Sequence, residues 1–395
     1  MKKWFWIFAA AALTVPWFLS WPLQIQWSPI LQAIFSGLAV MGAAFLLSWG
    51  AEIAQFEIPR SLALAFVAIV AVLPEYAVDI YIAGKAGRDP AYIPYAVANM
   101  TGANRLIIGV AWVLVVFIAW IRTGKRSVSV EKSHGFEFSI LFLVTLYSFI
   151  IFFKRTLSLE DGVVLFGFFM VYLWIASKGE IEEPLVEGPA EVIARLPRRT
   201  RRILIFSIFA FSFLAIASAA RPFAEGLIAT GRYFHIEEFL LIQILAPLAS
   251  EAPEFIVAAM LAFRGNASLG IGTLLSSKVN QWTLLVGMVP IVYIISSVTG
   301  GHAMAPLPLD NRQIEEILLT SAQSFCAIAI IADFDLSLWD AGLLFLLYIL
   351  QFFFSSTHAR YIFAILYVCF GLGIFTLKKK NRFAILGHFL TLRKK

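Results

Sequence analysis

Long apolar runs, separated by short charged or Pro/Gly-rich breaks, follow one another along the whole chain. Most approach the roughly 20 residues that an α-helix needs to cross a bilayer. Nothing shows the alternating segments of about ten residues that build a membrane β-barrel. The pattern therefore predicts an all-α polytopic membrane protein. Its twelve predicted spans lie near residues 4–22, 30–50, 61–84, 92–121, 137–153, 160–177, 203–222, 237–263, 268–298, 313–332, 338–354 and 359–377.

Composition and charge agree with this class. Of the 395 residues, 60% are apolar and 14% are charged, which is too little polar surface to cover a soluble globule. The net charge of +6 does not indicate nucleic acid as a partner, because the Lys and Arg residues cluster beside the ends of apolar runs. With the N-terminus inside, the basic segments 122–132, 194–202 and 378–382 all face the cytoplasm. We expect a protein of the prokaryotic plasma (inner) membrane, with both termini cytoplasmic and the lipid bilayer around it.

The chain contains an internal repeat. The segment LPEYAVDIYIAGKAGRD resembles APEFIVAAMLAFRGNAS, and Pro253 follows Pro74 by 179 residues. The same offset relates most of the other spans in two groups of five. Because five is odd, the second group must enter the membrane from the side opposite to the first. We therefore predict two inverted-topology five-helix repeats, the architecture in which transporters place a binding site near the midplane.

The repeat predicts the domain organisation. The N-terminal run has the basic start of a signal peptide but no clear cleavage site, so we expect it to be retained as a span. The predicted parts are an extra helix in 1–29, a first repeat in 30–177, a cytoplasmic linker in 178–202, a second repeat in 203–354, and a final helix with a basic tail in 355–395.

Each repeat carries a proline followed directly by glutamate inside an apolar span. A proline has no backbone N–H to donate to the carbonyl four residues earlier, so the helix loosens there and exposes that carbonyl oxygen. Further carboxylates stand nearby: Asp79 lies four residues after Glu75, and Glu251 three before Glu254. Each pair thus shares one helix face. Four carboxylates in a membrane indicate water, bound cations, protons or basic partners.

Polar residues follow both acidic helices and suit the coordination of a hard cation through oxygen. Lys278 and Arg105 suit only the role of counter-charges. The candidate supporting residues are Asn99, Asn104, Arg105, Ser250, Ser277, Lys278, Asn280 and Gln281.

These two segments resemble the paired alpha repeats of the cation/calcium exchanger superfamily, which includes sodium/calcium and proton/calcium exchangers. The family pattern is close to G-T-S-L-P-E followed by G-N-x-x-G-S-N-I-F-N, and the likeness covers the ten central spans. The resemblance implies an antiporter of the sodium/calcium exchanger type, in which Glu75 and Glu254 bind the metal ion or its counter-ion in alternation. Glu251 and Asp79 are further candidates for ion binding.

The chain departs from the family pattern at several positions. The serine three residues before the glutamate is Val72 in the first repeat and Glu251 in the second, and Lys278 replaces a usual asparagine. A later ligand position falls on Gly102 and Gln281 in an ungapped comparison. The register of the first repeat leaves both Asn99 and Asn104 as candidates. The identity of the cation depends on these differences.

The residues leave three functions open. The leading hypothesis is a secondary active antiporter that exchanges calcium, or a related cation, for sodium or protons by alternating access. The alternatives are a sodium/proton antiporter on the same scaffold, with Lys278 as counter-charge, and a scaffold or receptor that transports nothing. In the last case Glu75 and Glu254 are structural and pair with Arg105 and Lys278. No enzyme signature or cofactor motif is present, so we expect small cations as cargo, no catalysis and no cofactor.

Overall fold

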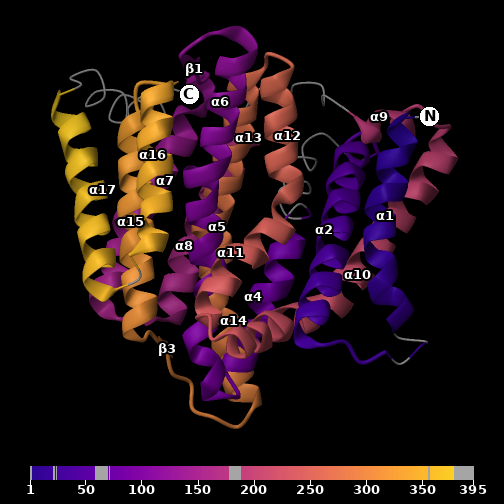
Figure 1. Cartoon of the computed structure of the whole chain (residues 1–395), viewed down its shortest axis with the longest axis horizontal. Helices are drawn as coiled ribbons and strands as arrows, with labels where there is room; N and C mark the ends of the chain where they lie inside the picture. Colours follow the sequence, from indigo (N-terminus) through magenta and orange to yellow (C-terminus); the bar gives the residue numbers. More distant parts are fainter. Residues whose placement is uncertain are drawn as a thin grey trace. The chain divides into compact units, whose positions relative to one another are not determined.

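The computed structural model describes residues 2–20, 23, 25–57, 70, 72–177, 188–354 and 356–377. Within them the chain is almost entirely helical (Figure 1). Nine helical segments are long and apolar enough to cross a membrane, and the interrupted pair of α11 and α12 makes a tenth among the described residues. The predicted span 61–84 is described only at residues 70 and 72–84, and the basic tail after residue 377 lies outside the described residues.

The chain divides into two compact units that interleave in sequence, 1–85 with 170–253, and 86–169 with 254–395. The first unit contains α1 (Lys2–Ser20), α2 (Pro29–Ala54), α9 (Pro189–Ala194), α10 (Arg198–Phe234), α11 (Glu238–Ser250) and nearly all of α4 (Leu73–Ala86). The second contains η1 (Pro90–Tyr95), α5 (Ala98–Leu106), η2 (Ile107–Ala111), α6 (Trp112–Thr123), η3 (Lys132–His134), α7 (Gly135–Lys154), most of α8 (Leu159–Ala176) and of α12 (Ala252–Phe263), α13 (Ala267–Asn280), η4 (Gln281–Leu285), α14 (Val286–Thr299), α15 (Asn311–Ile331), α16 (Leu338–Phe353) and α17 (Thr357–Leu377).

In the first unit, small residues bring the helices together. A Cβ atom on Gly42 of α2 would lie 2.3 Å from the carbonyl oxygen of Ala10 on α1, and one on Gly226 of α10 would lie 2.8 Å from the amide nitrogen of Ala33. Only glycine permits such close approach of helix backbones in a membrane. Helix α10 is longer than its predicted span, 203–222. It begins at Arg198, continues past Pro222 and ends at Phe234.

The second unit shows the repeat in its short strands. β1 (Ser127–Ser129) follows α6 as β3 (Leu307–Pro308) follows α14, and β2 (Thr156–Leu157) follows α7 as β4 (Asp335–Ser337) follows α15. β1 pairs antiparallel with β4, and β2 pairs antiparallel with β3. Each small sheet therefore joins a strand of the first repeat to a strand of the second, and the two sheets are equivalent when the repeats are exchanged.

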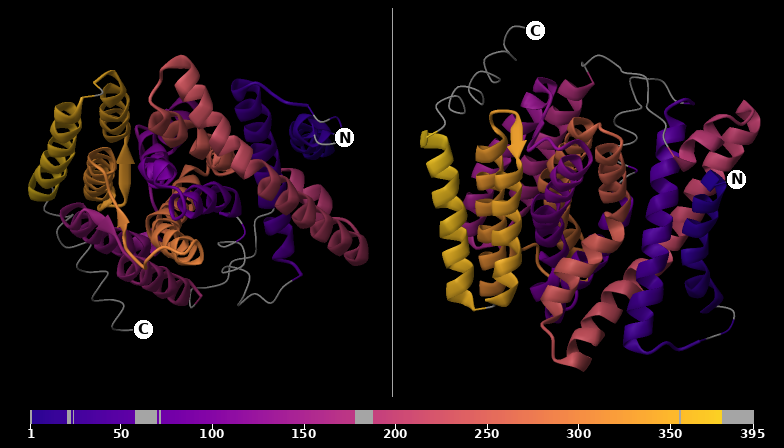
Figure 2. Two further views of the ribbon diagram at one scale, coloured as in Figure 1. Left: turned by 90° about the horizontal axis from the view of Figure 1, so that it is seen from below. Right: turned by 45° about the horizontal axis from the view of Figure 1, so that its top comes forward.

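The second unit also holds two π-helical segments and the last helix. The π-helical turns η2 and η4 each follow a polar stretch, on α5 and α13 respectively. π-Turns widen a helix locally and often occur at functional sites. Helix α17 packs along α15, in the orange-to-yellow group of Figures 1 and 2.

Candidate functional site

The first proline–glutamate pair lies at the start of a helix. Helix α4 begins at Leu73, so Pro74 is its second residue and Glu75 its third. The missing N–H of proline costs little in the first turn, where no acceptor exists for it, and the positive end of the helix dipole favours a carboxylate there. Glu75 and Asp79 are each only 1% exposed. The unit thus buries two carboxylates one helical turn apart.

The second proline–glutamate pair has the same local structure. Helix α11 ends at Ser250, the chain turns at Glu251, and α12 begins at Ala252, which makes Pro253 the second residue of this helix and Glu254 the third. The amide of Glu251 donates to the carbonyl of Pro247 at 2.8 Å, and the Ser250 hydroxyl donates to that of Ala246 at 3.1 Å. Both repeats therefore present a glutamate in the first turn of a helix.

The carboxylates of this second segment differ in exposure. Glu251 is fully buried, whereas Glu254 is partly exposed. The Oε2 atom of Glu254 is nevertheless inaccessible and has no hydrogen-bond partner among the described residues. Buried polar atoms normally have a partner, so this oxygen is an exception that needs an explanation.

Helix α5 contributes two asparagines in different situations. Asn99 is 1% exposed, and in the part of the chain that is described neither its amide oxygen nor its amide nitrogen has a hydrogen-bond partner. Asn104 is fully buried and its Nδ2 donates to the carbonyl of Met100 at 2.8 Å. This bond fixes the orientation of the Asn104 amide.

Lys278 on α13 contacts Asn104. The ammonium Nζ donates to the side-chain Oδ1 at 2.7 Å and to the backbone oxygen of the same residue at 3.1 Å. Nζ also lies 4.9 Å from the ring centroid of Trp282. The structure therefore brings together two residues of the predicted set, one from each repeat.

Arg105 has a different environment. Its guanidinium donates to Glu316 on α15, and both side chains are 3% exposed. Arg312 lies 2.6 Å from the other oxygen of Glu316, and Arg360 on α17 lies 2.6 Å from Glu315. This buried ionic cluster ties α5 and α17 to α15. The sequence reasoning missed it, although two glutamates inside the predicted span 313–332 were a visible signal.

The remaining predicted residues lie around the start of η4. Asn280 is 4% exposed and Gln281 is fully buried, whereas Ser277 is only partly buried. Asn280 ends α13 and Gln281 is the first residue of the π-helical turn. Within the described residues, no three His, Cys, Asp or Glu side chains form a cluster that could hold a metal ion.

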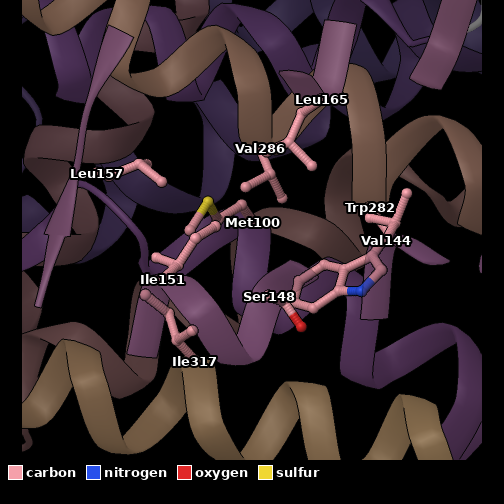
Figure 3. A pocket seen from close by; sticks show the side chains of 9 residues that line it. All are labelled: Met100, Val144, Ser148, Ile151, Leu157, Leu165, Trp282, Val286 and Ile317. Carbon is pink, nitrogen blue, oxygen red and sulfur yellow. The ribbon is translucent and has the colours of Figure 1, made fainter. Parts of the chain in front are cut away.

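A small pocket in the second unit is not suited to an ion. Figure 3 shows its lining, which includes Met100, Ile151 and Leu165. The Ser148 hydroxyl in this lining donates to the carbonyl of Thr145 at 2.7 Å and lies 2.7 Å from the Ser321 hydroxyl. An almost wholly apolar lining cannot replace the hydration shell of a cation.

Comparisons with known proteins agree with this architecture. The family model described as sodium/calcium exchanger protein matches residues 27–178 and 204–357. The chain is similar to a crystal structure of the H+/Ca2+ exchanger CAX, with 42% identity and a TM-score of 0.94 over 100% of this chain and 98% of the other. No match appears among the curated proteins.

More distant structures share the fold. Native YfkE matches with 14% identity and a TM-score of 0.64 over 92% of this chain and 99% of its own. The sodium–calcium exchanger NCX_Mj matches with 16% identity and a TM-score of 0.53 over 83% and 98%. The predicted fold class, an all-α membrane protein built from two repeats, is confirmed, although the described residues contain nine or ten candidate spans where the sequence predicted twelve.

Proposed function

Because the chain belongs to the sodium/calcium exchanger protein family, we propose that it is a secondary active antiporter that exchanges calcium, or a related cation, for protons or sodium. The observation that carries this proposal is the pair of proline–glutamate segments, each of which presents a carboxylate in the first turn of a membrane helix. Protons are the favoured counter-ion, since the relative with 42% identity is an H+/Ca2+ exchanger.

Glu75 and Glu254 are the proposed primary ligands of the transported cation, and Asp79 and Glu251 add further negative charge. Ionised carboxylates among apolar residues are costly without a bound cation or proton. The oxygens therefore hold either cargo, and release of one favours binding of the other. Alternating access of a site near the middle of the membrane then produces exchange. Asn99 supports this assignment, because its buried amide has no partner among the described residues.

The formal charge of these groups is compatible with proton coupling. Four carboxylates and Lys278 give −3 when all are ionised, and Arg105 is left out of this count because it pairs with Glu316. One calcium ion and one proton would neutralise this charge. Carboxylates in poorly hydrated surroundings take up protons readily.

A sodium/proton antiporter on the same scaffold is the second candidate. The observation that favours it is the buried ammonium of Lys278 beside Asn104, where the family has an asparagine in place of the lysine. A resident positive charge disfavours a divalent ion more than a monovalent one.

We also propose the plasma membrane of a prokaryote as the location, with both termini cytoplasmic. The support comes from the basic residues at the start of α10, such as Arg198, Arg201 and Arg202, which lie on the same predicted side as the basic tail.

Flux into liposomes reconstituted with the purified protein tests the proposal. We expect calcium uptake driven by an acidic interior, and collapse of this uptake when an ionophore dissipates the pH gradient. Glu75→Gln and Glu254→Gln should reduce uptake to that of protein-free vesicles, because each removes one charged ligand. Glu131→Gln, at an exposed loop position, is the matched control and should transport normally.

Two outcomes would overturn the proposal. Sodium/proton exchange, without calcium movement under either a sodium gradient or a proton gradient, would establish the second candidate instead. Unchanged transport in both glutamine variants would show that the carboxylates are structural.

A further inference from the structure

The surroundings of the Lys278 ammonium have the composition of a cation site. Two oxygens of Asn104, one from the side chain and one from the backbone, lie 2.7 and 3.1 Å from Nζ. The face of the Trp282 ring lies on the same ammonium, 4.9 Å away at its centroid. Amide oxygens and an aromatic face are groups that bind compact monovalent cations.

This arrangement is built into the helices rather than formed by a flexible side chain. The bond from the Asn104 amide to Met100 fixes Oδ1 in place, and Lys278 and Trp282 are each only 2% exposed. The π-helical turn η2 begins three residues after Asn104. In this stretch successive backbone carbonyls accept from side chains: that of Asn104 from Lys278, and that of Arg105 from Gln323 at 3.3 Å.

We propose that Lys278 is a tethered cation that fills a monovalent-cation site formed by Asn104 and Trp282. Its covalently attached ammonium replaces one free ion that the transporter would otherwise have to bind. The part of this inference that concerns transport rests on the proposed function, because the attached ammonium would change the number of free cations that each transport cycle requires. The binding site itself can be tested without any transport.

Three substitutions separate the charge of the lysine from its volume. Lys278→Ala removes the charge and opens space beside the oxygens of Asn104, so that Na+ or K+ can enter. Lys278→Met removes the charge but keeps most of the volume, which leaves no room for an ion. The double variant Lys278→Ala/Asn104→Ala has the space without the side-chain oxygen.

The first measurement is the thermal unfolding of each purified variant in detergent, with NaCl or KCl exchanged for choline chloride at constant ionic strength. We expect Lys278→Ala to gain a saturable increase in melting temperature beyond that of the unaltered protein, because a ligand that binds only the folded state stabilises it. Lys278→Met and the double variant should not gain it. If Lys278→Ala does not fold, Lys278→Ser, which also removes the charge and opens the space, is measured in the same way.

The second measurement is calcium flux in liposomes. In Lys278→Ala, flux in choline should fall by a factor within the roughly 5–150-fold range of coupled sites and recover when Na+ or K+ is added. Lys278→Arg, which keeps the charge, should show no such monovalent dependence.

The two proposals fail in distinguishable ways. A folded Lys278→Ala whose melting temperature responds to Na+ and K+ as the unaltered protein does would overturn the tethered-cation inference, even if calcium transport is intact. If the unaltered protein moves no calcium but Lys278→Ala gains monovalent binding, the antiport proposal fails and the inference stands.

Discussion

Arg105 and Lys278, two buried cations among the described residues of the second unit, differ in the groups they contact. Arg105 meets the carboxylate of Glu316 in a closed ionic cluster. Lys278 meets the neutral oxygens of Asn104 and the face of Trp282. Since Asn104 and Arg105 are consecutive, one stretch of α5 supports both arrangements. The comparison shows that one stretch of α5 is joined to α15 through an ion pair and to α13 through neutral oxygens.

Removal of Glu316 should have the largest effect on stability. Glu316→Leu leaves Arg105 buried without its carboxylate and takes the same partner from Arg312, so we expect a loss of about 3–5 kcal/mol in the free energy of unfolding. Arg105→Met should cost less, because Arg312 remains with Glu316. Denaturation in detergent measures both changes.

Two further variants sharpen this contrast. The double variant Arg105→Met/Glu316→Leu should recover part of the loss, since no unpaired arginine remains at position 105. Lys278→Met leaves the oxygens of Asn104 without this donor, which costs about 1–3 kcal/mol. Equal losses in Glu316→Leu and in the double variant would contradict the ion pair between Arg105 and Glu316.

An ionic cluster outside the membrane spans provides the next test. Glu57, which follows α2, accepts from Arg202 at 2.5 Å and from Arg201 Nε at 2.9 Å, and these bonds lower the pKa of its carboxyl to about 2. Because the folded pKa lies below the usual 4.5, the stabilisation is present above pH 4.5 and is lost as the pH falls through 2.

The effect of Glu57 should be modest because Arg202 is half exposed to solvent. We expect about 1 kcal/mol or less at neutral pH, smaller than the shift alone implies, owing to screening. Unfolding of Glu57→Gln should therefore depend less on acid between pH 4.5 and 2 than unfolding of the unaltered protein. The same acid dependence in both proteins would assign it to other carboxylates.

The smallest effect concerns a neutral contact. Ser148→Ala removes the hydrogen bond between α7 and Ser321 on α15 and should cost about 1 kcal/mol. Calcium flux should not change, because the pocket beside Ser148 is almost wholly apolar. Altered ion dependence in this variant would show that the pocket takes part in transport.

Much of the fold could be predicted from the periodicity of the sequence. The apolar runs and the offset between Pro74 and Pro253 locate the helices, because membrane spans have a characteristic length and repeats preserve their order. The break beside Pro253 agrees with the loosening expected at that proline, whereas the π-helical turns could not be predicted, since they depend on local hydrogen-bond register rather than on hydrophobicity.

The candidate site was predictable only in part. Carboxylates within apolar runs are conspicuous, so Glu75 and Glu254 stand out in the sequence. The contact between Asn104 and Lys278 depends on how two helices cross, and their residues lie 174 positions apart. The pairing of Arg105 with Glu316 likewise depends on the rotation of α5 relative to α15, which no span boundary reveals.

Calcium–calcium exchange tests the central claim, that Glu75 and Glu254 bind the transported cation, most directly. Liposomes loaded with radioactive calcium, with no sodium and the same alkaline pH on both sides, should release it faster when calcium is added outside, because calcium–calcium exchange needs binding but no counter-ion. We predict this release for the unaltered protein and for Glu131→Gln, and its loss in folded Glu75→Gln and Glu254→Gln. Exchange at the unaltered rate in either glutamine variant would contradict the account.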